Sequence, residues 1–168
     1  MLTSDGVPTP RDIEKIRPPD EIRRERPLVW VECFQEIPCD PCHQACPSGA
    51  IVEFEDINDI PNVMHELCTG CGLCIASCPG LAIFVVDESE GPDQALVSMP
   101  YEMLPVPVTG QMVTLLDRSG RPAGRGEVVR VRNPKTFDRT AVVTVRIPAS
   151  KVDDIRAIAL PGGDVDAK

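Results

Sequence analysis

The sequence of 168 residues has few large side chains with which to fill a hydrophobic core. Aromatic residues make up 4% of it, whereas proline occurs 18 times and cysteine eight times. A chain of this composition is expected to draw part of its stability from cross-links or bound metal.

The sequence also lacks the apolar stretches of exported and membrane-spanning chains. Residues 1–27 are charged and rich in proline, without the apolar segment of a signal peptide. Every apolar run is far shorter than the ~20 residues of a spanning helix. Eight cysteines without an export signal point to a reducing compartment, where they hold metal more often than they pair as disulfides. We therefore expect a cytoplasmic protein with no membrane span.

Basic residues are missing from the middle of the chain. Residues 28–100 contain twelve acidic residues and no Lys or Arg, a formal charge of -12, whereas residues 1–27 are neutral and residues 101–168 carry +3. All eight cysteines lie in the acidic part. These shifts predict an extended arm over 1–27, a cysteine-bearing domain over 28–100, a small domain over 101–160 and a tail over 161–168. The acidity also argues against a nucleic-acid partner.

An internal repeat organises the eight cysteines. The two copies are Cys33-x5-Cys39-x2-Cys42-x3-Cys46-Pro47 and Cys68-x2-Cys71-x2-Cys74-x3-Cys78-Pro79. After each Cys-Pro, a short turn leads to an Ala-Ile that opens a strand-like apolar run. Such repetition predicts two related units packed against each other.

Two metal chemistries compete for these cysteines. Zinc accepts four thiolates in a tetrahedron and commonly uses Cys-x2-Cys pairs. Ordinary zinc ribbons, however, need neither runs of three closely spaced cysteines nor a Cys-Pro ending. The pattern favours iron–sulfur clusters over zinc, and favours disulfides least.

The run from Cys68 to Pro79 resembles that of two-cluster bacterial ferredoxins, with which it agrees without a gap. In that family the fourth cysteine of each run binds the cluster of the other run. The resemblance therefore implies an α+β, ferredoxin-type core with two [4Fe-4S] clusters. Its implied ligands are Cys33, Cys39, Cys42 and Cys78 for cluster one, and Cys68, Cys71, Cys74 and Cys46 for cluster two.

The first run departs from the family pattern. Five residues separate Cys33 from Cys39, where the pattern has two. A longer surface loop is easily accommodated, since each doubling of loop length costs only about 0.6 kcal/mol. Without Cys33, the site would have three thiolates and would hold a three-iron cluster or take an external fourth ligand.

Small and polar residues beside the runs have expected roles. Gly70 and Gly72 allow close approach of the backbone, so that N–H groups can point at cluster and thiolate sulfur. His43 and His65 are not required as ligands, and we interpret them as surface or packing residues. Trp30, the only tryptophan, is expected to pack over the core.

The part after Pro100 has the pattern of a small β unit. Strands are expected over residues 111–117, 126–132 and 140–147, which are rich in Val and Thr and separated by turn signals. A short helix is expected to follow, with Ser150 as its N-cap and with Val152, Ile155 and Ile158 on one side. Arg118, Arg121 and Arg125 are interpreted as residues of a solvated turn.

No catalytic constellation is visible in the sequence, because the β unit has no His, no Cys and no Gly-rich phosphate loop. We expect a non-catalytic electron-transfer subunit of a larger oxidoreductase, in a hetero-oligomer. A free ferredoxin carrier and a structural iron–sulfur assembly module are the alternatives. Most of residues 28–147 also resembles ferredoxin-type small subunits of FAD-dependent amino- or imino-acid dehydrogenases, in the segments VWVECFQEIPCDPCHQACPSGAI, CTGCGLCIASCPGLAIFVVD and LVSMPYEMLPVP and the β region after them. That resemblance implies flavin-containing partner subunits.

Overall fold

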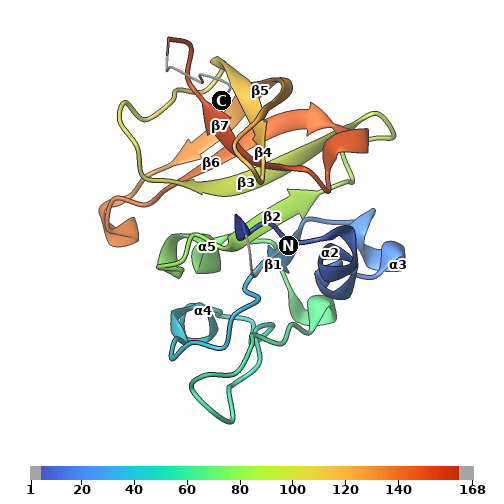
Figure 1. Cartoon of the computed structure of the whole chain (residues 1–168), viewed down its shortest axis with the longest axis vertical. Coiled ribbons are helices and arrows are strands. Elements are labelled where there is room, and N and C mark those ends of the chain that lie inside the picture. The colour runs from blue at the N-terminus through green and yellow to red at the C-terminus, as the bar shows by residue number, and fades with distance from the viewer. Residues whose placement is uncertain (1–4, 163–168) are drawn as a thin grey trace.

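A seven-stranded antiparallel sheet with short helices packed below it forms the fold, which is mixed α and β (Figure 1). The computed structural model describes residues 5–162. The predicted tail is therefore described only over residues 161 and 162. The helices are α2 (Pro10–Ile16), α3 (Asp20–Arg23), α4 (Pro41–Gln44) and α5 (Leu73–Ser77). The strands are β1 (Leu28–Val31), β2 (Ile83–Asp87), β3 (Gln94–Tyr101), β4 (Met112–Asp117), β5 (Pro122–Arg132), β6 (Ala141–Pro148) and β7 (Ile155–Ala159).

The sheet joins the cysteine-bearing part of the protein to the C-terminal part. Its strand order is β1-β2-β3-β6-β5-β4-β7, and β3 pairs with β6 from Gln94 opposite Pro148 to Tyr101 opposite Ala141. Pro100, where the composition changes, lies inside β3. The strands expected over 111–117, 126–132 and 140–147 are present as β4, β5 and β6. The C-terminal strands thus extend one sheet that begins beside the cysteines.

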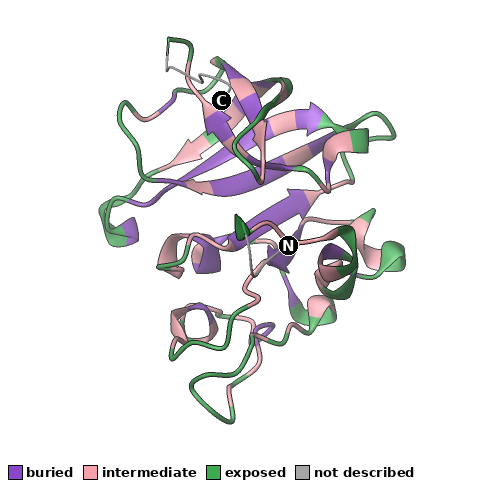
Figure 2. Cartoon of the chain, viewed as in Figure 1, coloured by how far each residue is buried: buried purple, intermediate pink, exposed green. Residues whose placement is uncertain are grey.

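Strands β1 and β2 separate two hydrophobic cores. Alternate side chains of a strand point to opposite faces. Trp30 and Phe84 therefore enter the core above, with the strands of the C-terminal part, as expected for Trp30. Val29 and Val85 enter the core below, which includes Cys42, Cys68 and Cys74. Figure 2 shows the strands largely buried and the loops of the lower part more exposed.

The helix expected after Ser150 is not formed, and this expectation was wrong. Residues Ala149–Lys151 form a single 3-10 turn, and Ile155–Ala159 form the edge strand β7. Ile158 lies opposite Leu115 of β4, and both Ile155 and Ile158 are fully buried. Pairing with β4 and burial in the upper core outweigh the helical spacing of these residues.

The N-terminal arm packs on its own chain. Thr9 caps α2 in a capping box with Asp12, and the Pro10 ring begins the helix. Ile13 is only 4% exposed and belongs to the upper core. Short helices between the prolines therefore order the described part of the arm, which a proline-rich composition had suggested would be extended.

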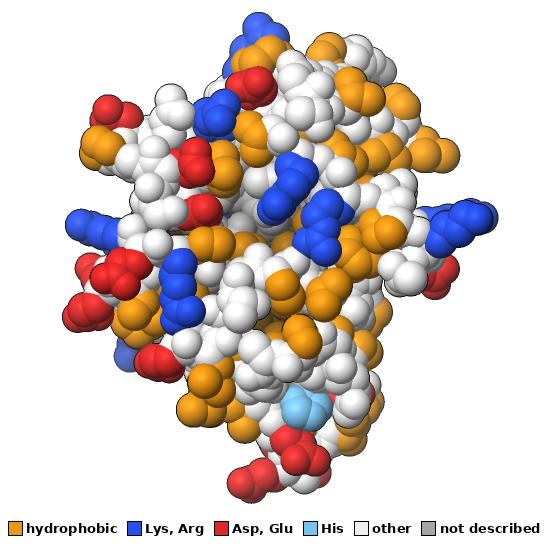
Figure 3. Space-filling view, turned by 180° about the vertical axis from the view of Figure 1, so that it is seen from behind, with side chains coloured by type: hydrophobic (Ala, Val, Ile, Leu, Met, Phe, Trp, Pro, Cys, Tyr) orange, Lys and Arg blue, Asp and Glu red, His pale blue; other side chains and the backbone are white. Residues whose placement is uncertain are grey.

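Surface charge is unevenly distributed. In the view from behind, Lys and Arg side chains lie on the upper and middle parts of the face, and the lower tip carries acidic side chains (Figure 3). This follows from the absence of Lys and Arg between residues 28 and 100. No helix within residues 5–162 is long and apolar enough to cross a membrane.

Candidate metal centres

The eight cysteines line two separate hollows, four to each. The first hollow has about 360 Å³ of empty space, solvent included, and the second has about 320 Å³. Cysteines of the first hollow are Cys33, Cys39, Cys42 and Cys78. Cysteines of the second hollow are Cys46, Cys68, Cys71 and Cys74. Each hollow thus takes three cysteines from one run and the last cysteine of the other run.

Two short helices bring the cysteines to the hollows. Helix α4 begins at Pro41 and carries Cys42, and helix α5 carries Cys74. Gly72 precedes α5 with a φ of 73°, a left-handed conformation that glycine adopts without steric cost. The backbone can therefore turn tightly between Cys71 and Cys74.

Gly70 lets two segments approach each other closely in the second run. Its φ is 65°, and a β-carbon added to it would lie 2.7 Å from both the carbonyl oxygen and Cγ of Pro27. Its backbone N–H donates to the sulfur of Cys68 at 3.4 Å. The expectation that glycine here allows an N–H group to face a thiol sulfur is confirmed at Gly70.

All eight cysteines are free thiols, and they differ in exposure. Cys42, Cys68 and Cys74 are buried, Cys71 is exposed, and the others are half-buried. Within residues 5–162, no three His, Cys, Asp or Glu side chains converge closely enough to hold a single metal ion. The sulfurs instead surround the two hollows.

Burial and neighbouring sulfurs make several of these thiols hard to ionise in the absence of metal. Burial raises the pKa of Cys42 to about 11, with smaller contributions from Cys78 and Cys39. Burial raises the pKa of Cys74 to about 12, with contributions from Cys71, Cys68 and Cys46. Thiolates in such positions need a positive partner, and iron supplies one.

Cys46 is the exception among the perturbed thiols. Burial opposes its ionisation, but hydrogen bonds from the backbone N–H groups of Ile51, Ala50 and Ser48 and from the Ser48 hydroxyl outweigh it. The pKa of Cys46 is therefore lowered. The turn after Cys46-Pro47 therefore places hydrogen-bond donors around the sulfur of Cys46, the cysteine of the first run that lines the second hollow.

Each histidine contacts a backbone carbonyl group: His43 contacts the segment after Cys46, and His65 contacts β1. Nδ1 of His43 lies 2.9 Å from the carbonyl oxygen of Ile51, and Nε2 of His65 lies 3.2 Å from that of Val29. Neither lines a cysteine hollow. Their interpretation as packing residues is confirmed.

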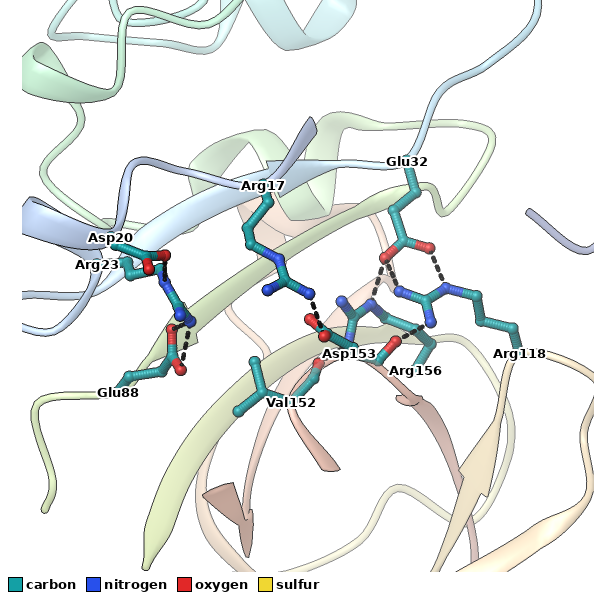
Figure 4. A network of polar contacts seen from close by, with 9 residues as sticks. All are labelled: Arg17, Asp20, Arg23, Glu32, Glu88, Arg118, Val152, Asp153 and Arg156. Carbon is teal, nitrogen blue, oxygen red and sulfur yellow. Dashed lines mark hydrogen bonds and ion pairs between the residues drawn. The ribbon is translucent and has the colours of Figure 1, made fainter. Parts of the chain in front are cut away.

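A buried ionic network lies directly beside the first run. Glu32, the residue before Cys33, accepts hydrogen bonds from Nε and Nη2 of Arg118 at 2.7 and 2.6 Å and from Nε of Arg156 at 2.5 Å (Figure 4). The Arg156 guanidinium also lies over the rings of Trp30 and Phe84, 5.2 and 5.1 Å from their centroids. The strand that leads into the first hollow is therefore tied to β7 and to the turn after β4.

The structure corrects the interpretation of Arg118 as a residue of a solvated turn. Its side chain is 12% exposed, whereas that of Arg121 is 77% exposed and pairs with Asp117. Arg118 also donates to the carbonyl oxygen of Asp153. Two sequence features pointed to this network: Glu32 ends the apolar run LVWVE, and Arg156 lies inside the apolar run IRAIAL.

Comparison with known proteins assigns a chemistry to the cysteine-bearing segment. Residues 33–88 match the family described as the LdpA Fe-S cluster-binding domain. This segment is a ferredoxin-like iron–sulfur-binding region. The iron–sulfur assignment made from the two cysteine runs is thereby confirmed.

Curated relatives share the same part of the sequence. A subunit of the ion-translocating oxidoreductase complex of Methanosarcina acetivorans is 38% identical over 77 residues, which are 44% of this chain and 27% of the relative. Ferredoxin-type protein NapF of Escherichia coli K12 is 38% identical over 52 residues, 30% of this chain and 32% of the relative. The iron-sulfur subunit of the nitrate-inducible formate dehydrogenase of the same strain is 52% identical over 42 residues, 24% of this chain and 14% of the relative.

The shared region is a fraction of each relative. The chain spans about a third or less of the length of these three proteins. No solved structure matches the chain significantly.

Proposed function

We propose that the chain holds two [4Fe-4S] clusters and passes single electrons as a subunit of a larger oxidoreductase. Cluster one would be held by Cys33, Cys39, Cys42 and Cys78. Cluster two would be held by Cys68, Cys71, Cys74 and Cys46. The grouping of four free thiols around each of two hollows is the observation that carries this proposal.

The donor set fits the group. Four cysteine thiolates are the usual ligands of a [4Fe-4S] cluster, and the exchange of the fourth cysteine between runs is the arrangement of two-cluster ferredoxins. Cys33 lines the first hollow despite the five residues between it and Cys39. A site of three thiolates is therefore the less favoured alternative.

The protein would control these centres through burial and hydrogen bonding. A [4Fe-4S] cluster supplies reversible one-electron reduction, at a potential set by net charge, hydrogen bonds to sulfur and solvent exposure. Gly70 donates to the sulfur of Cys68, and the Ala82 N–H donates to that of Cys78 at 3.5 Å. Cys42 in the first hollow and Cys74 in the second are buried, which would limit the solvent exposure of each cluster.

The names of the relatives support a role inside a complex. They include subunits of an ion-translocating oxidoreductase complex, of a formate dehydrogenase and of a polysulfide reductase. By analogy, this chain would link redox centres of larger partner subunits in a hetero-oligomer of the cytoplasm. A flavin in a partner is the further expectation from its resemblance to small subunits of FAD-dependent dehydrogenases.

Anaerobic purification of the tagged full-length protein from its native source tests this role. The expected result is co-elution with larger subunits, with flavin and iron present in the same fractions. Elution of a single iron-loaded protein would favour the free ferredoxin. A loaded protein that dithionite cannot reduce would favour a structural assembly module.

A further inference from the structure

The two hollows have opposite electrostatic surroundings. Two guanidinium groups contact the backbone of the run that forms the second hollow, whereas carboxylates flank the first. This contrast does not follow from the acidic composition of residues 28–100, because both arginines come from outside that part of the sequence.

Arg132, at the end of β5, reaches the loop of the second hollow. Its Nη1 donates to the carbonyl oxygen of Cys71 at 2.5 Å, and its guanidinium lies 5.2 Å from the ring centroid of Phe137. A β-carbon on Gly72 would lie 3.6 Å from the same Nη1. The hydrogen bond to Cys71 and the ring of Phe137 hold the positive charge against the loop.

Arg26, at the end of the arm, contacts the backbone at the start of the same run. It donates to the carbonyl oxygen of Cys68 at 3.0 Å and to that of Glu66 at 2.8 Å. Within the described residues, neither Arg26 nor Arg132 forms an ion pair with a carboxylate, so neither charge is neutralised by a direct partner. The residues that line the second hollow are all uncharged side chains or cysteines.

The first hollow differs in two ways: a carboxylate lines it, and the guanidinium groups beside its run, those of Arg118 and Arg156, are both ion-paired with Glu32. Asp59 is one of its lining residues, and Asp40 directly follows Cys39. Figure 3 shows acidic side chains at the lower tip of the molecule, without Lys or Arg beside them.

We propose that Arg132, supported by Arg26, raises the reduction potential of the second cluster above that of the first. This rests on the proposed presence of both clusters. Reduction adds one negative charge to a cluster, and an adjacent guanidinium stabilises the reduced form more than the oxidised form. Asp59 and Asp40 act in the opposite sense at the first site. Exposure of Cys71 adds solvation of the reduced second cluster. The second site is therefore reduced first.

An EPR-monitored redox titration of the full-length, cluster-loaded protein tests the assignment. The wild type should show two midpoint potentials. Arg132→Gln should lower the higher one, with a roughly tenfold smaller equilibrium constant for reduction, which is about 59 mV for a one-electron couple. Arg132→Lys retains the charge and should restore most of the wild-type potential. Asp59→Asn should raise the lower midpoint and leave the higher one in place.

Arg125→Gln is the matched control. It removes the same charge from an exposed position of the same strand, β5, and should move neither midpoint. Equal midpoints in the wild type, a shift of the lower midpoint in Arg132→Gln, or no shift at all would overturn the proposal. Iron analysis of the wild type and of each variant distinguishes a failure of the proposed function from a failure of the role given to Arg132. A wild type with a single cluster contradicts the proposed function itself. A protein with both clusters but no response to Arg132→Gln contradicts only the assignment to Arg132.

Discussion

Glu32 accepts a hydrogen bond of 2.5 Å from Nε of Arg156 across 124 residues of sequence, and both side chains are more than nine-tenths buried. Arg118 completes the network by donating to both oxygens of the same carboxylate. Because Glu32 precedes Cys33, this contact fixes the start of the first cysteine run to the C-terminal strands. It gives the C-terminal part of the sheet a structural role at the first hollow.

Replacement of Glu32 should strongly destabilise the protein. Glu32→Gln leaves Arg118 and Arg156 without their carboxylate in a buried site, and the loss of one partner of a buried ion pair costs about 3–5 kcal/mol. Urea unfolding of the loaded protein, followed by circular dichroism under anaerobic conditions, measures the loss. Glu127→Gln is the control, since Arg146 and Glu127 are 37% and 44% exposed and such pairs contribute about 0–1 kcal/mol. Equal losses in the two variants would contradict the role of the network.

The stabilisation by Glu32 should depend on pH. Burial alone opposes its ionisation, but the hydrogen bonds and charges of Arg118 and Arg156 outweigh burial and lower the pKa of Glu32 below its ordinary value of 4.5. The contribution is complete above pH 4.5 and is lost as the pH falls through the lowered, folded-state pKa. The difference in unfolding free energy between wild type and Glu32→Gln should therefore be constant above pH 4.5 and shrink below it. A difference that grows on acidification would be inconsistent with an ionised Glu32.

If the last cysteine of each run binds the cluster of the other run, cysteine variants from different runs should affect the same cluster. Cys46→Ser and Cys71→Ser should both weaken or abolish the second cluster, although Cys46 belongs to the first run. Cys39→Ser should affect the first cluster instead. Iron content and the EPR spectrum of the remaining cluster identify which site is lost. Glu66→Gln, an exposed change just before the second run that lines neither hollow, is the control and should retain both clusters. If Cys46→Ser gave the spectrum of Cys39→Ser, the crossed assignment would be wrong.

Gly70 should tolerate a side chain less well than Gly49. Both have left-handed backbones, with φ of 65° and 66°, which costs a non-glycine residue roughly 1–2 kcal/mol. The added β-carbon meets only open space at Gly49 but lies 2.7 Å from Pro27 at Gly70. Gly70→Ala should therefore lose more stability than Gly49→Ala, and should lose iron from the second site. Equal thermal midpoints for the two alanine variants would show that the close approach to Pro27 is unimportant.

The parts of the fold that the sequence predicts are those with local signatures. Alternating Val and Thr residues predict β5 and β6, and the resemblance of the cysteine runs to those of two-cluster ferredoxins implies the division of the cysteines between two sites. Helical spacing fails at residues 152–158, because Ile155 and Ile158 fit a strand edge as well as a helix face and pairing with β4 decides between them. Pairing with a distant strand has no signature in the local sequence.

The contacts that escaped prediction all join distant segments. Glu32 meets Arg118 and Arg156, which lie 86 and 124 residues away, and Arg132 meets Cys71 across 61 residues. Composition suggested that the arm and the C-terminal part were separate from the cysteine core. Arginines of the arm and of the C-terminal part instead supply the positive charges that the cysteine core lacks. These arginines come to lie beside the core only when the chain folds.

The most direct test of the account is the iron and inorganic sulfide content of the anaerobically prepared protein, measured together with its EPR spectrum after reduction. Two [4Fe-4S] clusters predict about eight iron atoms and about eight sulfides for each protein molecule, with signals from two interacting centres. Zinc in place of iron, or about four iron atoms with a single signal, would contradict the central claim.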